Sequence, residues 1–293
     1  MSDSDNDFAK LTGLVCSDNP IEVGLAQDRA LQLMGQLPKA RILAAKAYDR
    51  MRAFGGRAQK FGTQAVLVAG ERVLWPVDSG ATDSERAKWG LESLANLRKA
   101  AVHAPLIGKA TLRDILRARR DKLTEDALAS CSGRILDHGC AVLSSTSSDV
   151  VAAYWPLPGE ADPRPLAKLL SERDGARLAL PVVAGKDMKF REWKIGARLQ
   201  PAGFGSFGPD ESAPEVMPSI VLTPLLGFDR QGGRLGQGKG YYDRKLSASL
   251  GKPSPLVVGV ASSCQQLPVV PTECHDRRLD LLISEVEAID FRG

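Results

Sequence analysis

The stretch FDRQGGRLGQGKGYYDR, residues 228–244, holds five glycines in seventeen residues, with four basic side chains, two tyrosines and two aspartates. Glycine lets the backbone turn tightly or lie close to a ligand, and it leaves successive N–H groups available to anionic oxygens. Lys239, between Gly238 and Gly240, adds a mobile positive charge suited to a phosphate. The stretch therefore predicts a loop that binds a charged ligand.

The residues on either side of Lys239 refine this prediction. Residues 241–250 have the composition of a helix, so the loop would bring its ligand to a helix N-terminus, where the dipole favours negative charge. Asp243, in the first turn, would hold a divalent cation that bridges phosphates. The loop is not a P-loop, because Gly240 follows Lys239, and it lies too late in the chain for a Rossmann fingerprint. From glycine spacing alone, a solvated turn between a strand and a helix remains the alternative.

Apolar runs of five to eight residues surround the loop. Residues 219–226, SIVLTPLL, predict a strand that ends in it. Such runs, separated by helices, indicate parallel strands covered on both faces, and sheets of this kind bind ligands beyond the carboxyl ends of their strands. We therefore predict an α/β three-layer sandwich with a mostly parallel central sheet. The other predicted strands are 150–155, 177–183, 255–261 and 279–284, and the predicted helices are 109–136 and 165–173.

The first third of the chain differs in character. Residues 1–20 are polar and predict a disordered or loosely attached segment. Residues 21–54 predict two helices separated at Pro38, residues 64–75 a hairpin, and residues 83–101 a further helix. We divide the chain into a mainly helical extension, 1–108, of unknown function, and an α/β domain, 109–293.

Composition limits the function classes. The 293 residues carry a formal charge of +4, spread evenly, and no apolar run approaches the roughly 18 to 20 residues of a membrane span. The polar, acidic start is unlike a targeting segment, so a cytoplasmic protein without nucleic-acid or membrane partners is expected. A basic run favours a solvated helix face, and five cysteines without CxxC spacing predict free thiols. That run is Arg117, Arg119, Arg120 and Lys122.

Six motifs in order extend the argument beyond the loop. Residues 109–293 resemble the 5-formyltetrahydrofolate cyclo-ligase family, also called 5,10-methenyltetrahydrofolate synthetase, along essentially its whole length. The motifs are KATLR at 109–113, YWPLPGEADPRPL at 154–166, LPVV at 180–183, FREW at 190–193, RLGQGKGYYDR at 234–244, and VP-TECHDRRLD at 270–280.

The resemblance implies a reaction and its co-substrates. Members of the family use ATP and Mg²⁺ to close 5-formyltetrahydrofolate to 5,10-methenyltetrahydrofolate, with ADP and phosphate as the other products. Phosphorylation of the formyl oxygen makes it a good leaving group, and N10 then attacks the formyl carbon. Catalysis of this kind rests on positioning and on neutralising the transferring phosphoryl group.

The resemblance also implies the nucleotide and metal ligands. Lys109 and Arg113, four apart on one helix face, would contact ATP phosphates, although an exposed basic helix end is an equal alternative. Asp243 and Asp276 would bind Mg²⁺, although Asp276 by itself reads as a turn or cap residue. The main ATP loop would comprise Arg234, Leu235, Gly236, Gln237, Gly238, Lys239, Gly240, Tyr241 and Tyr242, with Lys239, Arg234 and Tyr241 catalytic.

Two residues outside the loop are implied folate ligands. Glu160 would accept hydrogen bonds from the amino group and ring N–H of the pterin, a bidentate use that suits a carboxylate, although by itself it reads as an ordinary exposed glutamate. Trp155 would offer an indole face to the flat heterocycle, although a core tryptophan is an equal alternative. Trp193 is more often a core residue than a ligand contact, and we leave it out of the site. The loop residues Gln237, Gly238, Lys239, Gly240 and Tyr241 would also lie against the folate.

The chain departs from the family pattern in places. Gln237 stands where many relatives have tyrosine, so the packing of the loop is expected to differ. The family's Gly-Ile-x-Glu-Pro segment appears as FGPDES at 207–212, which leaves the role of Glu211 open. Residues 1–108 lie outside the resemblance, and self-association through them is a separate prediction.

Two function classes follow from these residues. The first is an ATP-dependent cyclo-ligase acting on 5-formyltetrahydrofolate. The alternative is a non-catalytic nucleotide-binding or RNA-associated regulatory protein built on the same domain. Because every predicted ATP and metal ligand is present, the enzyme is favoured, and ATP consumption that depends on folate would separate the two.

Overall fold

The computed structural model describes residues 3–96, 104–203, 205–247 and 254–292, and it divides the chain into two compact units. The first unit comprises Met1–Ile115 and Leu267–Cys274, and the second comprises Leu116–Gln266 and His275–Gly293. The division into domains at 1–108 and 109–293 stays a prediction, because compactness does not show which part folds alone.

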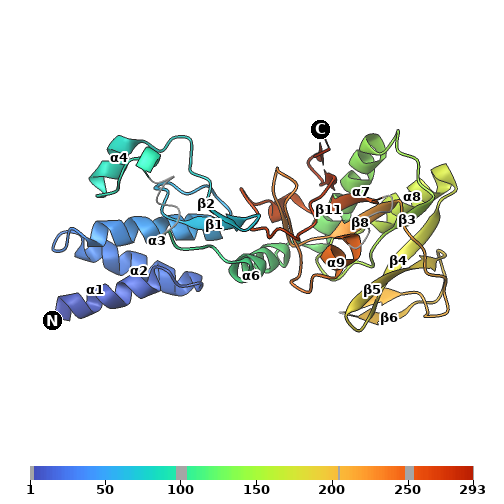
Figure 1. The fold of residues 1–293 in the computed structure, drawn as a ribbon, viewed down its shortest axis with the longest axis horizontal. Coiled ribbons are helices and arrows are strands. Elements are labelled where there is room, and N and C mark those ends of the chain that lie inside the picture. The colour runs from blue at the N-terminus through green and yellow to red at the C-terminus, as the bar shows by residue number, and fades with distance from the viewer. Residues whose placement is uncertain (1–2, 97–103, 204, 248–253, 293) are drawn as a thin grey trace. The chain divides into compact units, whose positions relative to one another are not determined.

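A seven-stranded sheet forms the centre of the second unit (Figure 1). Its order is β13-β12-β11-β8-β3-β4-β5; β4 is parallel to β3, β3 to β8, β8 to β11 and β11 to β12, whereas the edge strands β5 and β13 are antiparallel. The predicted mostly parallel sheet is confirmed. The strands are β3 (Val150–Ala152), β4 (Arg177–Ala184), β5 (Asp187–Trp193), β8 (Ile220–Pro224), β11 (Leu256–Val260), β12 (Leu281–Ile283) and β13 (Ala288–Asp290).

Successive residues of the central strands supply two different cores, one on each face of the sheet. Val151 packs in the core that contains residues of α7 (Glu125–Val142) and α8 (Arg164–Asp174). Val150 and Ala152 pack in the other core, which contains Leu246 of α9 (Tyr241–Ser247). The alternation gives helices on both faces, as Figure 1 shows for these three helices.

The two strands that matter most for a ligand site are β3 and β8. They are parallel neighbours, with Ala152 opposite Val221, yet the chain leaves β3 toward β4 on one side and reaches β8 on the other. The order of the strands therefore reverses between them, and ligands of open α/β sheets bind beyond the carboxyl ends of such a pair. The 154–160 loop follows β3, and the glycine stretch follows β8.

Short hairpins complete the second unit. Within the glycine stretch, β9 (Gly227–Phe228) pairs antiparallel with β10 (Arg234–Leu235), so its first part is a hairpin rather than open loop. The other small hairpin joins β6 (Gln200–Gly203) to β7 (Ser206–Gly208). A 3-10 turn, η2 (Ser263–Gln265), follows β11.

The first unit is mainly helical, as predicted for the N-terminal region. It contains α1 (Asp3–Leu14), α2 (Pro20–Leu33), α3 (Ala40–Phe54) and α4 (Asp83–Lys88), and a hairpin of β1 (Ala65–Val68) and β2 (Glu71–Leu74). Segment Leu267–Cys274 passes along this hairpin, where the Thr272 N–H donates to Leu67 O at 2.9 Å. Helix α6 (Lys109–Arg120) begins in this unit.

Three secondary-structure predictions are wrong within the described residues. Residues 3–14 form α1, and Leu11 and Val15, four apart, are buried, so the segment is not loose. The helix predicted at 83–101 is interrupted: α4 ends at Lys88, before Gly90 with φ +72°, helix resumes at residues 94–96, and residues 97–101 lie outside the described part. The helix predicted at 109–136 is two helices, because the Thr124 side chain accepts from the Ala127 N–H and starts α7 afresh.

The remaining predictions of this kind hold. Two helices on either side of Pro38 and the 64–75 hairpin are confirmed. The helix predicted at 241–250 is seen as α9, with residues 248–250 outside the described range. All five cysteines are free: Cys16 and Cys274 are exposed, Cys131 is buried, and Cys140 and Cys264 are half-buried. No described helix is both long enough and apolar enough to cross a bilayer.

Candidate active site

The glycine stretch is shaped by its own side chains. The Asp229 carboxylate accepts the N–H groups of Gln231 (2.9 Å) and Gly233 (2.8 Å), which folds the β9–β10 turn. A Cβ on Gly233 would lie 2.6 Å from Asp229 Oδ2, so this turn requires glycine. Gly238 (φ +100°) and Gly240 (φ +66°) have left-handed backbone on either side of Lys239, whose side chain is exposed.

Arg234 is the buried cation of the stretch, with a side chain that is 3% exposed. Its guanidinium forms an ion pair with Asp243 and lies over the Tyr242 ring, 5.8 Å from the centroid. Its Nε has no hydrogen-bond partner among the described residues. A buried, partly unsatisfied guanidinium is costly in a resting protein, which points to an acceptor that arrives with a ligand.

Asp243 and Asp276 are the predicted metal ligands, and a backbone contact brings the segment that holds Asp276 to Asp243. The N–H of Arg277, the residue after Asp276, donates to Asp243 Oδ1 at 3.4 Å, and the Arg234 ion pair falls on the same oxygen. No three His, Cys, Asp or Glu side chains gather into a metal site in the described ranges. Mg²⁺ needs only one or two carboxylates when substrate phosphates complete its shell, so this pair fits it.

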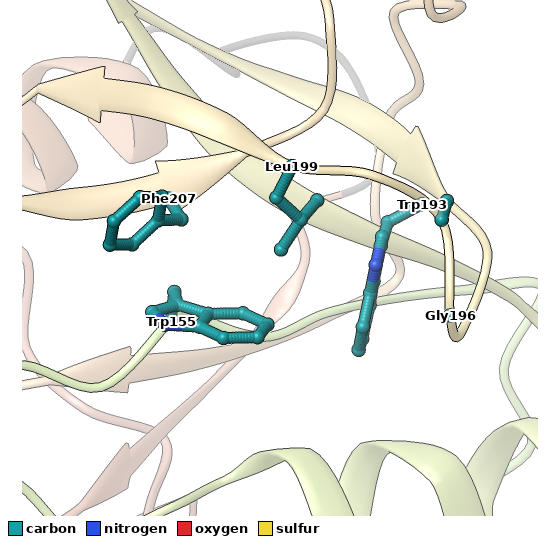
Figure 2. Close-up of a pocket in the computed structure, with 6 residues that line it drawn as sticks. Trp155, Trp193, Gly196, Leu199 and Phe207 are labelled. Atoms are coloured by element: carbon teal, nitrogen blue, oxygen red, sulfur yellow. The ribbon is translucent and has the colours of Figure 1, made fainter.

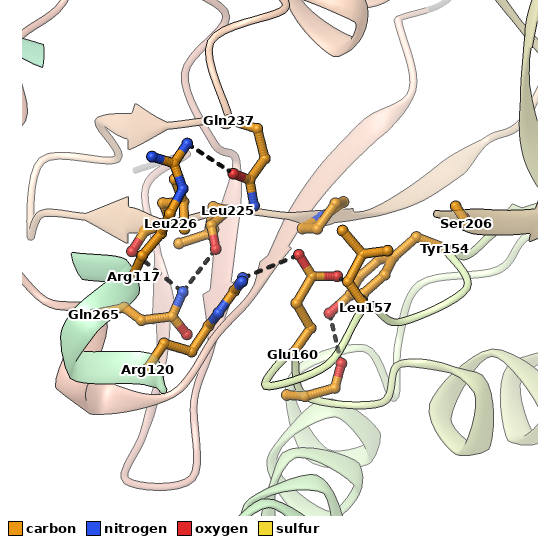
Figure 3. Close-up of polar contacts among 12 residues, drawn as sticks. Arg117, Arg120, Tyr154, Leu157, Glu160, Ser206, Leu225, Leu226, Gln237 and Gln265 are labelled. Atoms are coloured by element: carbon orange, nitrogen blue, oxygen red, sulfur yellow. Dashed lines mark hydrogen bonds and ion pairs between the residues drawn. The ribbon is translucent and has the colours of Figure 1, made fainter. Parts of the chain in front are cut away.

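Glu160 is buried beside the glycine stretch (Figure 3). Arg120 Nη1 lies 3.2 Å from its Oε1, and the Leu157 N–H donates to Oε2 at 3.0 Å. Burial raises the pKa of Glu160, and the hydrogen bonds from Leu157, Arg120 and Gln237 offset part of that rise. Glu160, from the loop after β3, and Gln237, from the glycine stretch, thus lie near one another, each in contact with an arginine of α6.

The basic run that the sequence assigned to a solvated helix face is partly buried. Arg120 is 7% exposed and pairs with Glu160, and Arg117 Nη2 lies 3.3 Å from Gln237 Oε1 (Figure 3). The prediction is wrong for Arg120 because its partner comes from a loop 40 residues away. Helical spacing cannot signal such a contact, and Arg120 is the site residue that the sequence missed.

Trp155 lines an apolar pocket of about 320 Å³ (Figure 2). The Trp193 and Phe207 rings meet Trp155 edge to face, at centroid distances of 6.4 and 6.3 Å. The Arg164 guanidinium stacks on Trp155 at 4.1 Å. Trp193, predicted to be a core residue, is buried and also lines the pocket, and its Nε1 has no hydrogen-bond partner among the described residues. The other lining residues are Gly196, Ala197 and Leu199.

Three other residues predicted for the site, Tyr241, Tyr242 and Lys109, interact with other residues of the protein. The Tyr241 hydroxyl donates to Gly185 O at 3.0 Å, which ties α9 to the β4–β5 turn. Tyr242 has a raised pKa because its hydroxyl is buried, with a further contribution from Glu160. Lys109, in the first unit, forms an ion pair with Glu273 at 2.9 Å, and Arg113 lies one turn further along α6.

Comparison with known proteins adds a family to this geometry. The model of the 5-formyltetrahydrofolate cyclo-ligase family matches residues 107–285. The 5-formyltetrahydrofolate cyclo-ligases of Haemophilus influenzae and Escherichia coli K12 are each 29% identical, over 59% and 58% of this chain and 95% and 96% of theirs. The NMR structure of Aquifex aeolicus 5,10-methenyltetrahydrofolate synthetase is 30% identical, with a TM-score of 0.51, over 63% of this chain and 93% of that chain.

Proposed function

We propose, since the chain belongs to the 5-formyltetrahydrofolate cyclo-ligase family, that it converts 5-formyltetrahydrofolate and ATP to 5,10-methenyltetrahydrofolate, ADP and phosphate. The observation that carries the proposal is that the end of α6 contacts two loops, with Arg120 at 3.2 Å from Glu160 and Arg117 at 3.3 Å from Gln237. Glu160 and Gln237 come from the loops after β3 and β8, the neighbouring strands between which the sheet order reverses. A folate ligand and a nucleotide loop are thereby expected at the same edge of the sheet.

On the folate side, Glu160 is the proposed hydrogen-bond acceptor. As a carboxylate it would accept from the amino group and ring N–H of the pterin, and its burial strengthens both bonds because little water competes. The apolar pocket beside Trp155 and Trp193 supports contact with the flat face of an aromatic ring.

On the nucleotide side, the glycine stretch is the proposed phosphate site. Its backbone, from Arg234 to Tyr242, would approach the phosphates where glycines remove Cβ atoms, with Lys239 supplying a positive charge. Arg234 would offer its unpaired Nε to an anionic oxygen. Lys109 and Arg113 are further phosphate ligands by resemblance to the family. Leu235 is buried, so its contribution would be through the backbone.

Mg²⁺ is the proposed metal, held by Asp243 and Asp276. When bound, it would neutralise phosphate charge as the phosphoryl group moves to the formyl oxygen. The residues of the chain do the remaining work: they bind both substrates, orient the formyl group toward the nucleotide, and exclude water. Arg234 would hold Asp243 in place through their ion pair.

The test is formation of the methenyltetrahydrofolate chromophore from 5-formyltetrahydrofolate, ATP and Mg²⁺. Lys239→Ala and Asp243→Ala are expected to lower turnover about a thousandfold with the fold retained, because Lys239 would neutralise the phosphoryl group directly and Asp243 would hold the Mg²⁺ that does so. Exposed Lys168→Ala is the matched control. No product from the wild type, with ATP still bound, would favour the non-catalytic alternative.

The extension has a separate test. Self-association through residues 1–108 stays a prediction, and size-exclusion chromatography with light scattering would check it on the full chain. A monomer at all concentrations would contradict it.

A further inference from the structure

Arg120 and Glu160 form a buried ion pair. The family motifs imply a folate role for Glu160 but no role for Arg120. Their side chains are 8% and 6% exposed. Transfer of two charges out of water is costly, and the cost is recovered only if the geometry and the other hydrogen bonds are good. A buried pair at the edge of a candidate ligand site therefore calls for an explanation other than stability.

The turn before Glu160 is built around Arg120. Leu157 O accepts the Glu160 N–H at 2.9 Å, with Pro158 and Gly159 between them, and Gly159 has φ +79°. Proline followed by a residue of positive φ is the pattern of a type II turn. A Cβ on Gly159 would lie 3.3 Å from Arg120 Nε and 3.4 Å from its Cγ, so glycine lets the turn lie against the arginine.

Each oxygen of the carboxylate has its own donor. Arg120 Nη1 contacts Oε1, and the Leu157 N–H contacts Oε2. Rotation of the carboxylate would break both contacts, so its plane is set. Arg120 Nε has no hydrogen-bond partner among the described residues, which leaves one buried donor beside the carboxylate.

The groups that face Glu160 come from four elements. Gln237, from the glycine stretch, is a neutral amide that itself contacts Arg117. Tyr154, after β3, and Tyr242, on α9, have pKa values raised by burial, so both are neutral near pH 7. Among the described residues in hydrogen-bond contact with Glu160, Arg120 on α6 is the one full positive charge.

We propose that Arg120 is a positioning residue: it keeps Glu160 ionised and oriented to accept hydrogen bonds from the pterin. The proposal rests on the folate role of Glu160. Burial favours the protonated form of Glu160, and a protonated carboxyl would present a donor where the pterin also presents donors. The guanidinium opposes that protonation, and its removal raises the pKa of Glu160 further.

The first experiment needs no folate. The carboxyl ¹³C resonance of Glu160, assigned by its loss in Glu160→Gln, is titrated with pH in the wild type, Arg120→Met and Arg120→Lys. We expect the midpoint to move up by about one unit in Arg120→Met and to return most of the way in Arg120→Lys. Lys122→Met, an exposed neighbour in the same basic run, removes the same charge and should leave the midpoint in place.

The second experiment measures affinity for 5-formyltetrahydrofolate by tryptophan fluorescence over the same pH range. Arg120→Met is expected to weaken binding about tenfold near pH 7, with the loss diminishing at higher pH. In a Glu160→Gln background, the added Arg120→Met change should cost less than about twofold, since the two residues act as a unit. If Arg120→Met alone unfolds, Arg120→Lys is compared in both backgrounds instead, because lysine keeps the charge but cannot reproduce the guanidinium geometry.

The outcomes are distinct. An unchanged Glu160 midpoint in Arg120→Met, or equal affinity losses in both backgrounds, would overturn the role of Arg120. A wild type that forms no methenyl product while the midpoint shifts as expected would overturn the proposed function and leave the control of Glu160 by Arg120 in place.

Discussion

Asp49 in the first unit and Glu160 in the second are both buried carboxylates whose pKa is raised by burial. Asp49 accepts four donors from one short segment: the N–H groups of Lys60, Phe61 and Thr63 and the Thr63 hydroxyl, at 2.7 to 3.1 Å. Glu160 has donors from separate segments, and beside it Arg120 Nε has no partner within the part of the chain that the structure describes.

The difference separates a structural carboxylate from a ligand-binding one. The donors to Asp49 all come from the 60–63 turn, and they fix that turn against α3. Beside Glu160, Arg120 Nε has no hydrogen-bond partner among the described residues, and a buried donor of this kind calls for water or a ligand. Burial and a raised pKa are shared by both, so neither alone identifies a site.

The largest effect that would test this comparison is loss of catalysis in Glu160→Gln. We expect kcat/KM to fall about a thousandfold, because a charge-assisted, bidentate acceptor for the pterin is lost. Steady-state formation of the methenyl chromophore measures it, and exposed Glu172→Gln on α8 is the control. Near-normal turnover in Glu160→Gln would place Glu160 in the same class as Asp49.

Asp49→Ala should affect stability instead. Without the carboxylate, several buried donors lose their hydrogen-bond acceptor. We therefore expect the free energy of unfolding to fall by about 3 kcal/mol. Chemical denaturation of the full chain measures it, with exposed Asp28→Ala as the control. Folate affinity of the folded variant should match the wild type, and a large loss of affinity would contradict the structural role.

As the pH falls, folate binding should weaken at a higher pH than the pH at which an ordinary glutamate is protonated. Because the folded pKa of Glu160 is raised, the ionised form that binds the pterin is lost as pH falls through a value above about 4.3, the usual glutamate value. The folate dissociation constant should therefore rise on the acid side with a midpoint above the usual glutamate pKa. A midpoint below that value would contradict the raised pKa of Glu160.

The smallest expected effect concerns the apolar pocket. Trp155→Phe keeps an aromatic ring beside Trp193 and Phe207, so a loss of about 1 kcal/mol in folate binding, roughly fivefold, is expected. Trp155→Ala should cost more. Equilibrium titration measures both, and equal affinities in the two variants would remove this pocket from the folate site.

Features that are local in sequence were predictable. The β8 strand and the glycine stretch after it follow from an apolar run and from glycine spacing, and the parallel sheet follows from several such runs. The start of α7 was predictable too, because Thr124 precedes Glu125 and Asp126, a helix-start pattern. The buried spacing of Leu11 and Val15 was a weaker signal of α1.

Features that depend on tertiary contacts could not be predicted from the sequence. Arg117 and Arg120 are the same residue type in the same basic run of α6. The 157–160 turn nevertheless buries Arg120 and not Arg117. The edge strands β5 and β13 are partly exposed and lack the continuous apolar run that marks β8 and β11. The resemblance to a family supplied Glu160 and Asp276, which composition alone assigns to a surface glutamate and a turn.

The distribution of the free thiols has a practical consequence for spectroscopy. Both exposed cysteines, Cys16 and Cys274, belong to the first unit, whereas Cys131 in the second is buried and has its pKa raised by that burial to about 12. Thiolate is the reactive form, so a maleimide dye would attach preferentially to the first unit. A variant that keeps Cys16 as its single cysteine would then carry a reporter at a defined position in the extension while the folate residues stay unmodified.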